Sequence, residues 1–381
     1  MSITQVQGYC KPGFEAVRAA MANSLNSGGD LGASFAVTVE AETVIDIWGG
    51  WANEARTKPW ERDTIVNVYS TTKTMTALTA LMLADRGEID LHAPVAKYWP
   101  EFGANGKSRV KVSHLMSHAA GLSGWDTPMK PEDLYDWDRT CALLAAQAPW
   151  WTPGSEPGYH AVSQGFLIGE VIRRATGKTV GTVFREEIAK PLGADFHIGL
   201  APEHDGRVGE LTPPQTGIAQ GRDPKSISGR TLNNPALTAL EPRTRAWRQA
   251  EIPAAGGFGN ARSVAAIQSV MSNGGSVNGK RILSEAGTRV ALEPQLSGTD
   301  LVLGLPIKYG MGYGLPGEVM PLPSPNTCFW GGWGGSLVMN DFDRRVTFAY
   351  VMNKMGQGTT GDLRAFQLIM PVYQTLLAGN G

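Results

Sequence analysis

The sequence predicts an α/β protein in which strands from both chain ends form one antiparallel sheet flanked by helices, with a mainly helical region inserted between those ends. Near the start, residues 34–40 (SFAVTVE) and 43–48 (TVIDIW) are rich in β-branched and aromatic residues and lie two residues apart, as in a hairpin. Near the end, residues 336–340 (SLVMN) and 346–352 (VTFAYVM) repeat this pattern across a polar turn. Between these pairs the apolar residues recur mostly at helical spacing.

Helices are expected next to the strands at both chain ends and throughout the middle of the chain. Phe14, Val17, Met21 and Leu25 lie three and four residues apart, so they form one apolar stripe that ends before a pair of glycines. The other expected helices are 74–86, 140–147, 165–176, 180–189 and 362–377, the last of them kinked at Pro371.

Composition limits the class of protein. Lys and Arg number 34 and Asp and Glu 35, which gives a formal charge of −1, so no surface for nucleic acid or acidic lipid is expected. The start has no basic segment leading into an apolar run, and about 18 consecutive apolar residues occur nowhere, so we expect a cytoplasmic protein without a membrane span. Cys10, Cys141 and Cys328 form no C-x-x-C pair, which disfavours a disulfide framework or a zinc site.

Residues 70–73 (STTK) match the motif S-x-x-K, in which a hydroxyl and an amine share one face of a helix. Ser70 follows the strand-like segment 65–69 and precedes an apolar helical pattern, so it lies where a strand leads into a helix. The motif alone fits equally well with a serine that only caps the helix.

A second S-x-x-K runs from Ser108 to Lys111. It lies in a polar loop with no apolar helical pattern behind it, so we interpret Lys107, Arg109 and Lys111 as a solvated cluster and Ser108 as a surface residue.

Two further candidate catalytic residues, a tyrosine and a histidine, lie in expected loops. Tyr159, in the segment PGYHA, is either a base or an aromatic residue that packs under a loop. His118, in the segment LMSHAAGL, is either a base or a residue that holds its loop in place. His114 precedes it by four residues, but without an H-E-x-x-H pattern a zinc site is disfavoured.

Residues 330–336 (WGGWGGS) place four glycines at the start of an expected strand. Glycines there let a ligand or another backbone approach closely, so backbone N–H groups can serve an oxyanion. A hairpin corner that requires positive φ explains the glycines equally well. The nearest approach to G-x-S-x-G is 161–165 (AVSQG), which disfavours the nucleophile elbow of α/β-hydrolases.

Taken in order, STTK at Ser70, PGYHA at Tyr159 and WGGWGGS at Trp330 resemble the three active-site elements of the serine β-lactamase and penicillin-binding-protein superfamily. The likeness is strongest to its esterase branch, the family VIII carboxylesterases. Three further stretches agree with the family, and the likeness covers residues 13–378. These stretches are 115–122 (LMSHAAGL), 255–260 (AGGFGN) and 309–315 (YGMGYGL).

The resemblance implies a β-lactamase/transpeptidase-like fold. Its α/β domain consists of residues 1–73 and 255–381, its inserted and mainly helical domain of residues 74–254, and its active site lies between them.

The resemblance also implies roles for individual residues. Ser70 is the nucleophile, and Lys73 and Tyr159 share the proton that a general base removes, with either of them as that base. The other implied positions are the backbone N–H groups of Ser70 and Trp333 as the oxyanion hole, and Trp330, Gly331 and Gly332 as substrate-binding residues. No metal or organic cofactor is implied.

Two departures from the family bear on substrate choice. Class C β-lactamases have Y-x-N where this chain has Tyr159-His160-Ala161, so the asparagine amide is missing. They have K-T-G where this chain begins with Trp330, so the lysine that faces a β-lactam carboxylate is missing too. Both departures favour neutral esters.

We therefore expect a serine carboxylesterase that hydrolyses small, short-chain esters through an acyl-enzyme on Ser70. The alternatives are a β-lactamase or D,D-peptidase, a hydrolase of small amides, and a catalytically silent binding protein. The silent alternative is disfavoured because Ser70, Lys73 and Tyr159 are all present.

Overall fold

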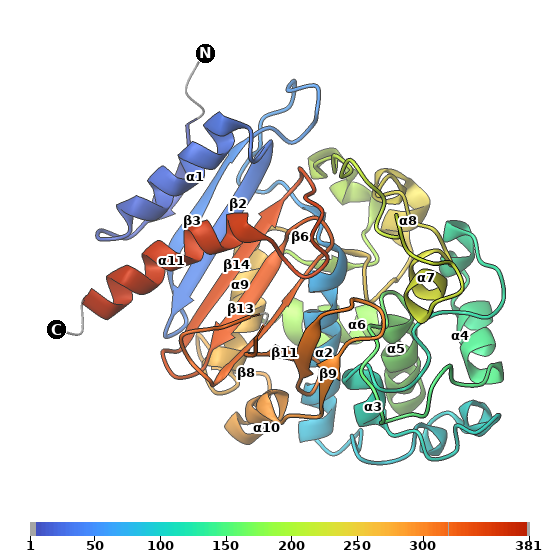
Figure 1. Cartoon of the computed structure of the whole chain (residues 1–381). Helices are drawn as coiled ribbons and strands as arrows, with labels where there is room; N and C mark the ends of the chain where they lie inside the picture. Colours follow the sequence, from blue (N-terminus) through green and yellow to red (C-terminus); the bar gives the residue numbers. More distant parts are fainter. Residues whose placement is uncertain (1–4, 319, 379–381) are drawn as a thin grey trace.

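The computed structural model describes residues 5–318 and 320–378, so residues 1–4, 319 and 379–381 of the expected α/β domain lie outside the described part. Its main element is an antiparallel sheet with the strand order β1-β3-β2-β14-β13-β12-β11-β10-β9 (Figure 1). The strands are β1 (Gln7–Cys10), β2 (Gly32–Val39), β3 (Glu42–Gly50), β9 (Leu296–Thr299), β10 (Pro306–Tyr309), β11 (Gly314–Leu315), β12 (Thr327–Gly331), β13 (Leu337–Asp341) and β14 (Val346–Met352).

The two expected hairpins meet at the centre of this sheet. β2 pairs with β3 on one side and with β14 on the other, with Phe35 opposite Tyr350 across the second pair. Every residue of β14 is buried, because helices cover both faces of the sheet at this point. The predicted sheet of strands from both chain ends is confirmed.

One face of the sheet carries α1 (Glu15–Ser27) and α11 (Leu363–Ala378), which pack on each other, and the opposite face carries α9 (Ala261–Ser272) (Figure 1). The apolar stripe of α1 is buried at Val17, Met21 and Leu25, as its spacing predicts. Gly28 ends α1 in the left-handed conformation, at φ 76°, and its N–H donates to Leu25 O. Pro371 lies inside α11.

The helical region packs beside the sheet around α2 (Thr72–Asp85), which is buried from Thr72 to Leu83. It is joined to the strands by a small sheet in which β6 (Gly257–Gly259) pairs with β4 (Val66–Asn67) and β5 (His197–Ile198). The remaining helices and strands are α3 (Val112–Met116), α4 (Trp137–Ala146), α5 (Ser163–Thr176), α6 (Val180–Phe184), α7 (Ile227–Leu232), α8 (Arg245–Gln249), α10 (Glu285–Arg289), β7 (Ser276–Val277) and β8 (Lys280–Arg281). The domain boundaries at 73 and 255 stay predictions.

The structure corrects the sequence analysis in several places. The helix expected at 180–189 is α6 continued by a π-helical turn, Arg185–Ala189. α4 begins three residues before its expected start because the Asp136 side chain accepts from Arg139 N and caps the first turn. Lys107 is not part of a solvated cluster, because it is buried and its ammonium donates to the carbonyl oxygens of Ala104 and Gln147.

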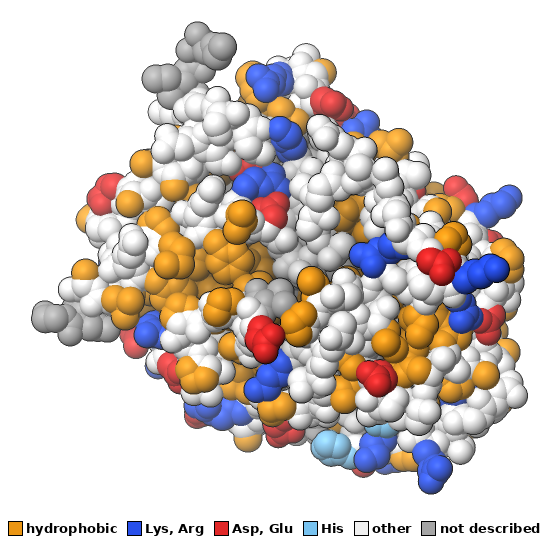
Figure 2. Space-filling view, in the orientation of Figure 1, with side chains coloured by type: hydrophobic (Ala, Val, Ile, Leu, Met, Phe, Trp, Pro, Cys, Tyr) orange, Lys and Arg blue, Asp and Glu red, His pale blue; other side chains and the backbone are white. Residues whose placement is uncertain are grey.

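Side chains of both charge signs are interspersed over the face seen in Figure 2. Among the described residues, the helices are all too short or too polar to cross a membrane.

Candidate active site

Ser70 lies on a short 3₁₀ turn, Tyr69–Thr71, between β4 and α2. Tyr69 has a positive φ of 42°, which turns the chain sharply from the strand into the helix. Thr71 occupies the N-cap position of α2, and no side chain caps that helix. The interpretation of Ser70 as a simple helix cap is therefore wrong.

Lys73 lies one helical turn after Ser70 and is fully buried. Its Nζ donates to Ser70 Oγ at 3.2 Å, to Ala161 O at 2.6 Å and to Ala254 O at 3.0 Å. Burial lowers the pKa of this amine well below its ordinary value of 10.5. In the neutral amine two N–H groups remain on the two carbonyls, so the lone pair points toward Ser70 Oγ.

Tyr159 comes from the loop before α5 and reaches Ser70 from the other side. Its hydroxyl donates to Ser70 Oγ at 2.5 Å, and its ring centroid lies 4.7 Å from Lys73 Nζ. Burial raises the pKa of this phenol, and the hydrogen bond with Ser70 partly opposes that effect. Tyr159 is therefore a neutral phenol in the free protein, and Ser70 Oγ lies between an amine and a phenol.

The third expected element, the glycine-rich strand end, lies against the backbone of Ser70. Gly332 N donates to Ser336 O at 2.8 Å, and Ser336 Oγ bonds Val68 O at 2.9 Å, so these bonds join the strand end to the turn that holds Ser70. Among the described residues, neither the N–H of Ser70 nor that of Trp333 donates to a protein acceptor. Two backbone donors at the mouth of the site are thus free for an oxyanion.

Trp330 is buried beside Tyr159, with their ring centroids 5.5 Å apart. Its indole N–H lies near the phenol oxygen and lowers the Tyr159 pKa, but it makes no hydrogen bond of normal geometry within the described part of the chain. Gly331 approaches a separate segment so closely that a Cβ atom there would lie 2.3 Å from the carbonyl carbon of Thr360. Trp330 therefore packs against the Tyr159 ring and supports that side of the site.

The two histidines near Tyr159 support its loop and do not contact Ser70. His118 Nδ1 accepts from His160 N at 2.9 Å, and His118 O accepts from Gly158 N at 3.0 Å. His160 Nε2 accepts from Leu122 N at 3.1 Å, which leaves Nδ1 to donate to Gly158 O. Burial lowers the pKa of His118 far below 6.5 and that of His160 to about 3. The loop-fixing interpretation of His118 fits these contacts.

A narrow hollow of about 470 Å³, its open mouth included, leads to Ser70. Apart from Tyr, Ser and Thr side chains, its walls are apolar, and no Lys or Arg lines it in the described part of the chain. Its apolar lining residues are Ala161, Val162, Ile218, Leu232, Pro235, Leu237, Ala255 and Trp333.

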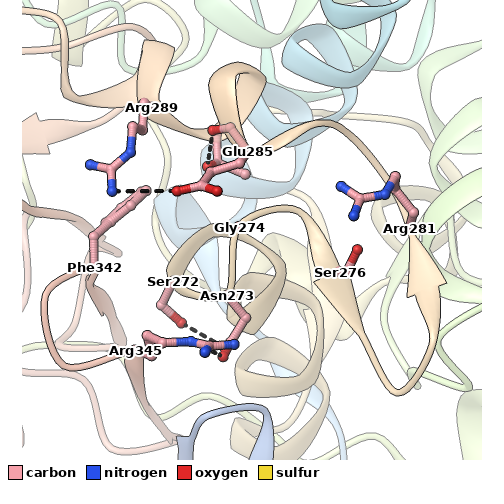
Figure 3. A pocket seen from close by; sticks show the side chains of 10 residues that line it. Ser272, Asn273, Gly274, Ser276, Arg281, Glu285, Arg289, Phe342 and Arg345 are labelled. Carbon is pink, nitrogen blue, oxygen red and sulfur yellow. Dashed lines mark hydrogen bonds and ion pairs between the residues drawn. The ribbon is translucent and has the colours of Figure 1, made fainter.

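A separate, charged hollow lies at the C-terminal end of α9 (Figure 3). Arg281, Arg289 and Arg345 line it, but Arg289 pairs with Glu285 at 3.6 Å and Arg345 Nε donates to Asn273 Oδ1 at 3.3 Å. The first bond lies within α10, and the second joins the β13–β14 turn to the end of α9. This hollow holds none of the acyl-transfer candidates.

Three contributions to the site were absent from the sequence analysis. The carbonyl groups of Ala161 and Ala254 orient Lys73, and the buried carboxylate of Asp300 accepts from the backbone N–H of Tyr159 at 3.1 Å. Backbone carbonyls leave no signal in a sequence. Asp300 has one, since it is a lone acid followed by the apolar residues 301–303 (LVL).

The antiparallel sheet, its covering helices and the helical region packed against α2 define a β-lactamase/transpeptidase-like fold, a class that includes esterases and penicillin-binding proteins. The chain belongs to the β-lactamase family, whose model, described as Beta-lactamase, matches residues 16–369.

Individual relatives agree with this assignment. The chain is 37% identical over 367 residues to the esterase/beta-lactamase LipL of Mycobacterium tuberculosis. The alignment covers 92% of this chain and 83% of LipL. The crystal structure of a family VIII carboxylesterase matches with a TM-score of 0.92 at 41% identity, covering 97% of this chain and 99% of that one. A penicillin-binding-protein homologue from Caulobacter crescentus matches with a TM-score of 0.90 at 37% identity, over 97% and 99% of the two chains. The chain is thus a hydrolase of the β-lactamase-like superfamily with esterases among its relatives.

Proposed function

We propose that this protein is a serine carboxylesterase that hydrolyses neutral, short-chain esters through an acyl-enzyme on Ser70. The observation that carries the proposal is the position of Ser70 Oγ, 3.2 Å from Lys73 Nζ and 2.5 Å from Tyr159 OH. The family VIII carboxylesterase among the similar structures and the esterase LipL among the relatives support it.

The hydrogen bonds around Ser70 favour Lys73 as the base. Because the Tyr159 hydroxyl donates to Ser70 Oγ, the proton of Ser70 itself is free to point at Lys73. Lys73 keeps two N–H groups on backbone carbonyls and offers its lone pair to that proton. As Oγ bonds to the ester carbonyl carbon, the proton moves to Lys73 and the carbonyl π electrons move to the oxygen.

The resulting oxyanion is stabilised by the free N–H groups of Ser70 and Trp333. The N-terminal end of α2 adds a partial positive charge at the same place. Each such donor typically contributes about 10²–10³ to kcat.

Collapse of the tetrahedral intermediate breaks the bond to the alcohol oxygen, which receives the proton held by Lys73 through the Tyr159 hydroxyl. The acyl group remains on Ser70. Water then attacks the acyl carbon, gives its proton to Lys73, and releases the acid as the proton returns to Ser70 Oγ. No other reactant is required.

The walls of the hollow support a neutral substrate. No Lys or Arg lines the hollow in the described part of the chain, so a substrate carboxylate that enters it loses its hydration without gaining a cation. Short acyl chains fit because the hollow is narrow and bounded by aliphatic side chains.

A p-nitrophenyl ester series from two to eight acyl carbons and a chromogenic cephalosporin test the proposal, together with mass spectrometry of the Ser70 peptide. We expect faster turnover of the short esters, an acyl adduct on Ser70, and a loss of at least about 10³-fold in kcat for Ser70→Ala. Ser108→Ala, at the exposed serine of the second S-x-x-K, is the matched control. Ester turnover that survives in Ser70→Ala contradicts the proposal.

A further inference from the structure

Asp300 is a buried carboxylate in the loop between β9 and β10, with 1% of its surface exposed. Its Oδ1 accepts from Tyr159 N at 3.1 Å, Val302 N at 2.9 Å and Leu303 N at 2.8 Å, and its Oδ2 accepts from Tyr309 OH at 2.8 Å. Across the described residues, no Lys, Arg or His forms an ion pair with it. Four neutral donors therefore compensate a carboxylate that is removed from water, and one of them is the backbone of the proposed catalytic tyrosine.

The N–H groups of three consecutive residues, Gly158, Tyr159 and His160, each have a buried acceptor. His118 supplies two of these acceptors, its carbonyl for Gly158 and its ring for His160. Asp300 supplies the acceptor for Tyr159. The middle N–H, on the residue whose hydroxyl meets Ser70, thus depends on a side chain that lies 141 residues away in the sequence.

The same carboxylate also holds the surroundings of the phenol ring. Tyr309, fixed by its bond to Asp300, lies with its ring centroid 4.9 Å from that of His118 and 5.7 Å from that of Trp330. Both of those rings pack on Tyr159. A bond from Leu301 N to Pro157 O at 2.9 Å joins the two loops a second time.

We propose that Asp300 is a positioning residue that holds the Tyr159 loop so that the phenol hydroxyl lies on Ser70 Oγ. The inference rests on the proposed function, because it assigns Asp300 an effect on ester hydrolysis only through Tyr159.

The consequences for kinetics follow from geometry. Without the carboxylate, the Tyr159 backbone loses its acceptor, and a shift of about 1 Å in a reacting group typically costs about 10²-fold in rate. We expect Asp300→Ala to lower kcat of a p-nitrophenyl butyrate assay by about 10²-fold and to change KM by less than about threefold, since Asp300 does not line the hollow. Asp300→Asn should recover most of the lost kcat, because its amide oxygen can accept from the same three N–H groups and its NH₂ group faces Tyr309 OH.

Asp341 offers a matched control. It is equally buried at the far end of β13, accepts from the backbone N–H groups of Asp343 and Arg344, and bonds the hydroxyl of Tyr373. Unlike Asp300, it also accepts from the Arg344 guanidinium at 3.2 Å. Asp341→Ala should therefore lower the melting temperature as Asp300→Ala does, but leave kcat within about threefold of the wild type.

The deciding experiment is a double-mutant cycle with Tyr159→Phe. If Asp300 acts through the Tyr159 hydroxyl, Asp300→Ala has no further effect on kcat once that hydroxyl is gone. The inference is overturned if the kcat losses of the two single variants multiply in the double variant. It is also overturned if Asp341→Ala loses as much kcat as Asp300→Ala, because Asp300 then only stabilises the fold. If Asp300→Ala does not fold, Asp300→Ser replaces it in the same cycle, with the same two outcomes.

The failure of this inference and that of the proposed function are distinguishable. If the wild-type protein neither cleaves the ester nor forms an adduct on Ser70, the proposed function is wrong. If the wild-type protein does both and Asp300→Ala has an unchanged kcat, only the role proposed for Asp300 is wrong.

Discussion

Gly332 lies so close to the Ser70 turn that even a methyl side chain should disturb the site. A Cβ atom at this position would lie 2.2 Å from Val68 O, 2.4 Å from Ser336 Oγ and 3.3 Å from Ser70 N. Carbon atoms do not approach a carbonyl oxygen more closely than about 3 Å, so Gly332→Ala forces the strand end away from the Ser70 turn by roughly 1 Å.

The expected loss in rate follows from that displacement. The N–H groups of Ser70 and Trp333 belong to the two segments that separate, so they can no longer meet one oxyanion at the distances of 2.7–3.1 Å that such a site requires. Losing one donor costs about 10²–10³ in kcat, and we expect Gly332→Ala to fall in that range.

Steady-state kinetics on p-nitrophenyl butyrate and the rate of Ser70 acylation measure this loss. Gly206→Ala serves as the control, because no heavy atom lies within 4 Å of the added Cβ and Gly206 has no positive φ. A Gly332→Ala variant that folds and keeps kcat within about threefold of the wild type would refute the assignment of these two N–H groups.

Four further predictions concern the base, Trp330 beside Tyr159, the pH dependence of kcat/KM and the pH dependence of the melting temperature. Lys73→Ala and Tyr159→Phe should each lower kcat by about 10²–10⁴ but be strongly non-additive, and losses that multiply would separate the two residues into independent units. Trp330→Lys should raise kcat/KM for a cephalosporin, relative to kcat/KM for a short ester, by roughly tenfold, because the new ammonium can bind the substrate carboxylate. An unchanged ratio would show that other residues set the choice of substrate. Because burial lowers the pKa of Lys73, kcat/KM should rise with pH and level off below 10.5. Because His118 and His160 are neutral when folded and charge below about pH 6.5 when unfolded, the melting temperature should fall as the pH drops from 6.5 toward 3, and a constant melting temperature across that range would contradict their burial.

Much of the fold could be predicted from local pattern. The segment 346–352 has the bounds of β14, and the stripe at Val17, Met21 and Leu25 is the buried face of α1. These elements are long enough for period 2 or period 3.6 to be visible in the chain. β9, β10 and β11 contain four, four and two residues, which is too short to show a period, so the far third of the sheet was not predicted.

The polarity of a segment did not predict whether its lysine is exposed to solvent. Lys107 lies in a polar segment, which predicts a solvated ammonium, but its stem is buried and two carbonyls accept its protons. Whether such acceptors are present depends on how loops pack on one another.

The sequence by itself determined the pair Ser70 and Lys73, because a serine on the turn that opens a helix and a lysine three residues later share one face. Only the tertiary structure decided what surrounds that pair. Tyr159 is 89 residues from Ser70, the Ala254 carbonyl is 181 residues from Lys73, and Asp300 is 141 residues from Tyr159. Local periodicity describes only a few consecutive turns of the chain. Contacts between residues so far apart arise when the helical region packs on the sheet. That packing brings the amine of Lys73, the phenol of Tyr159 and the loop that Asp300 holds to one serine.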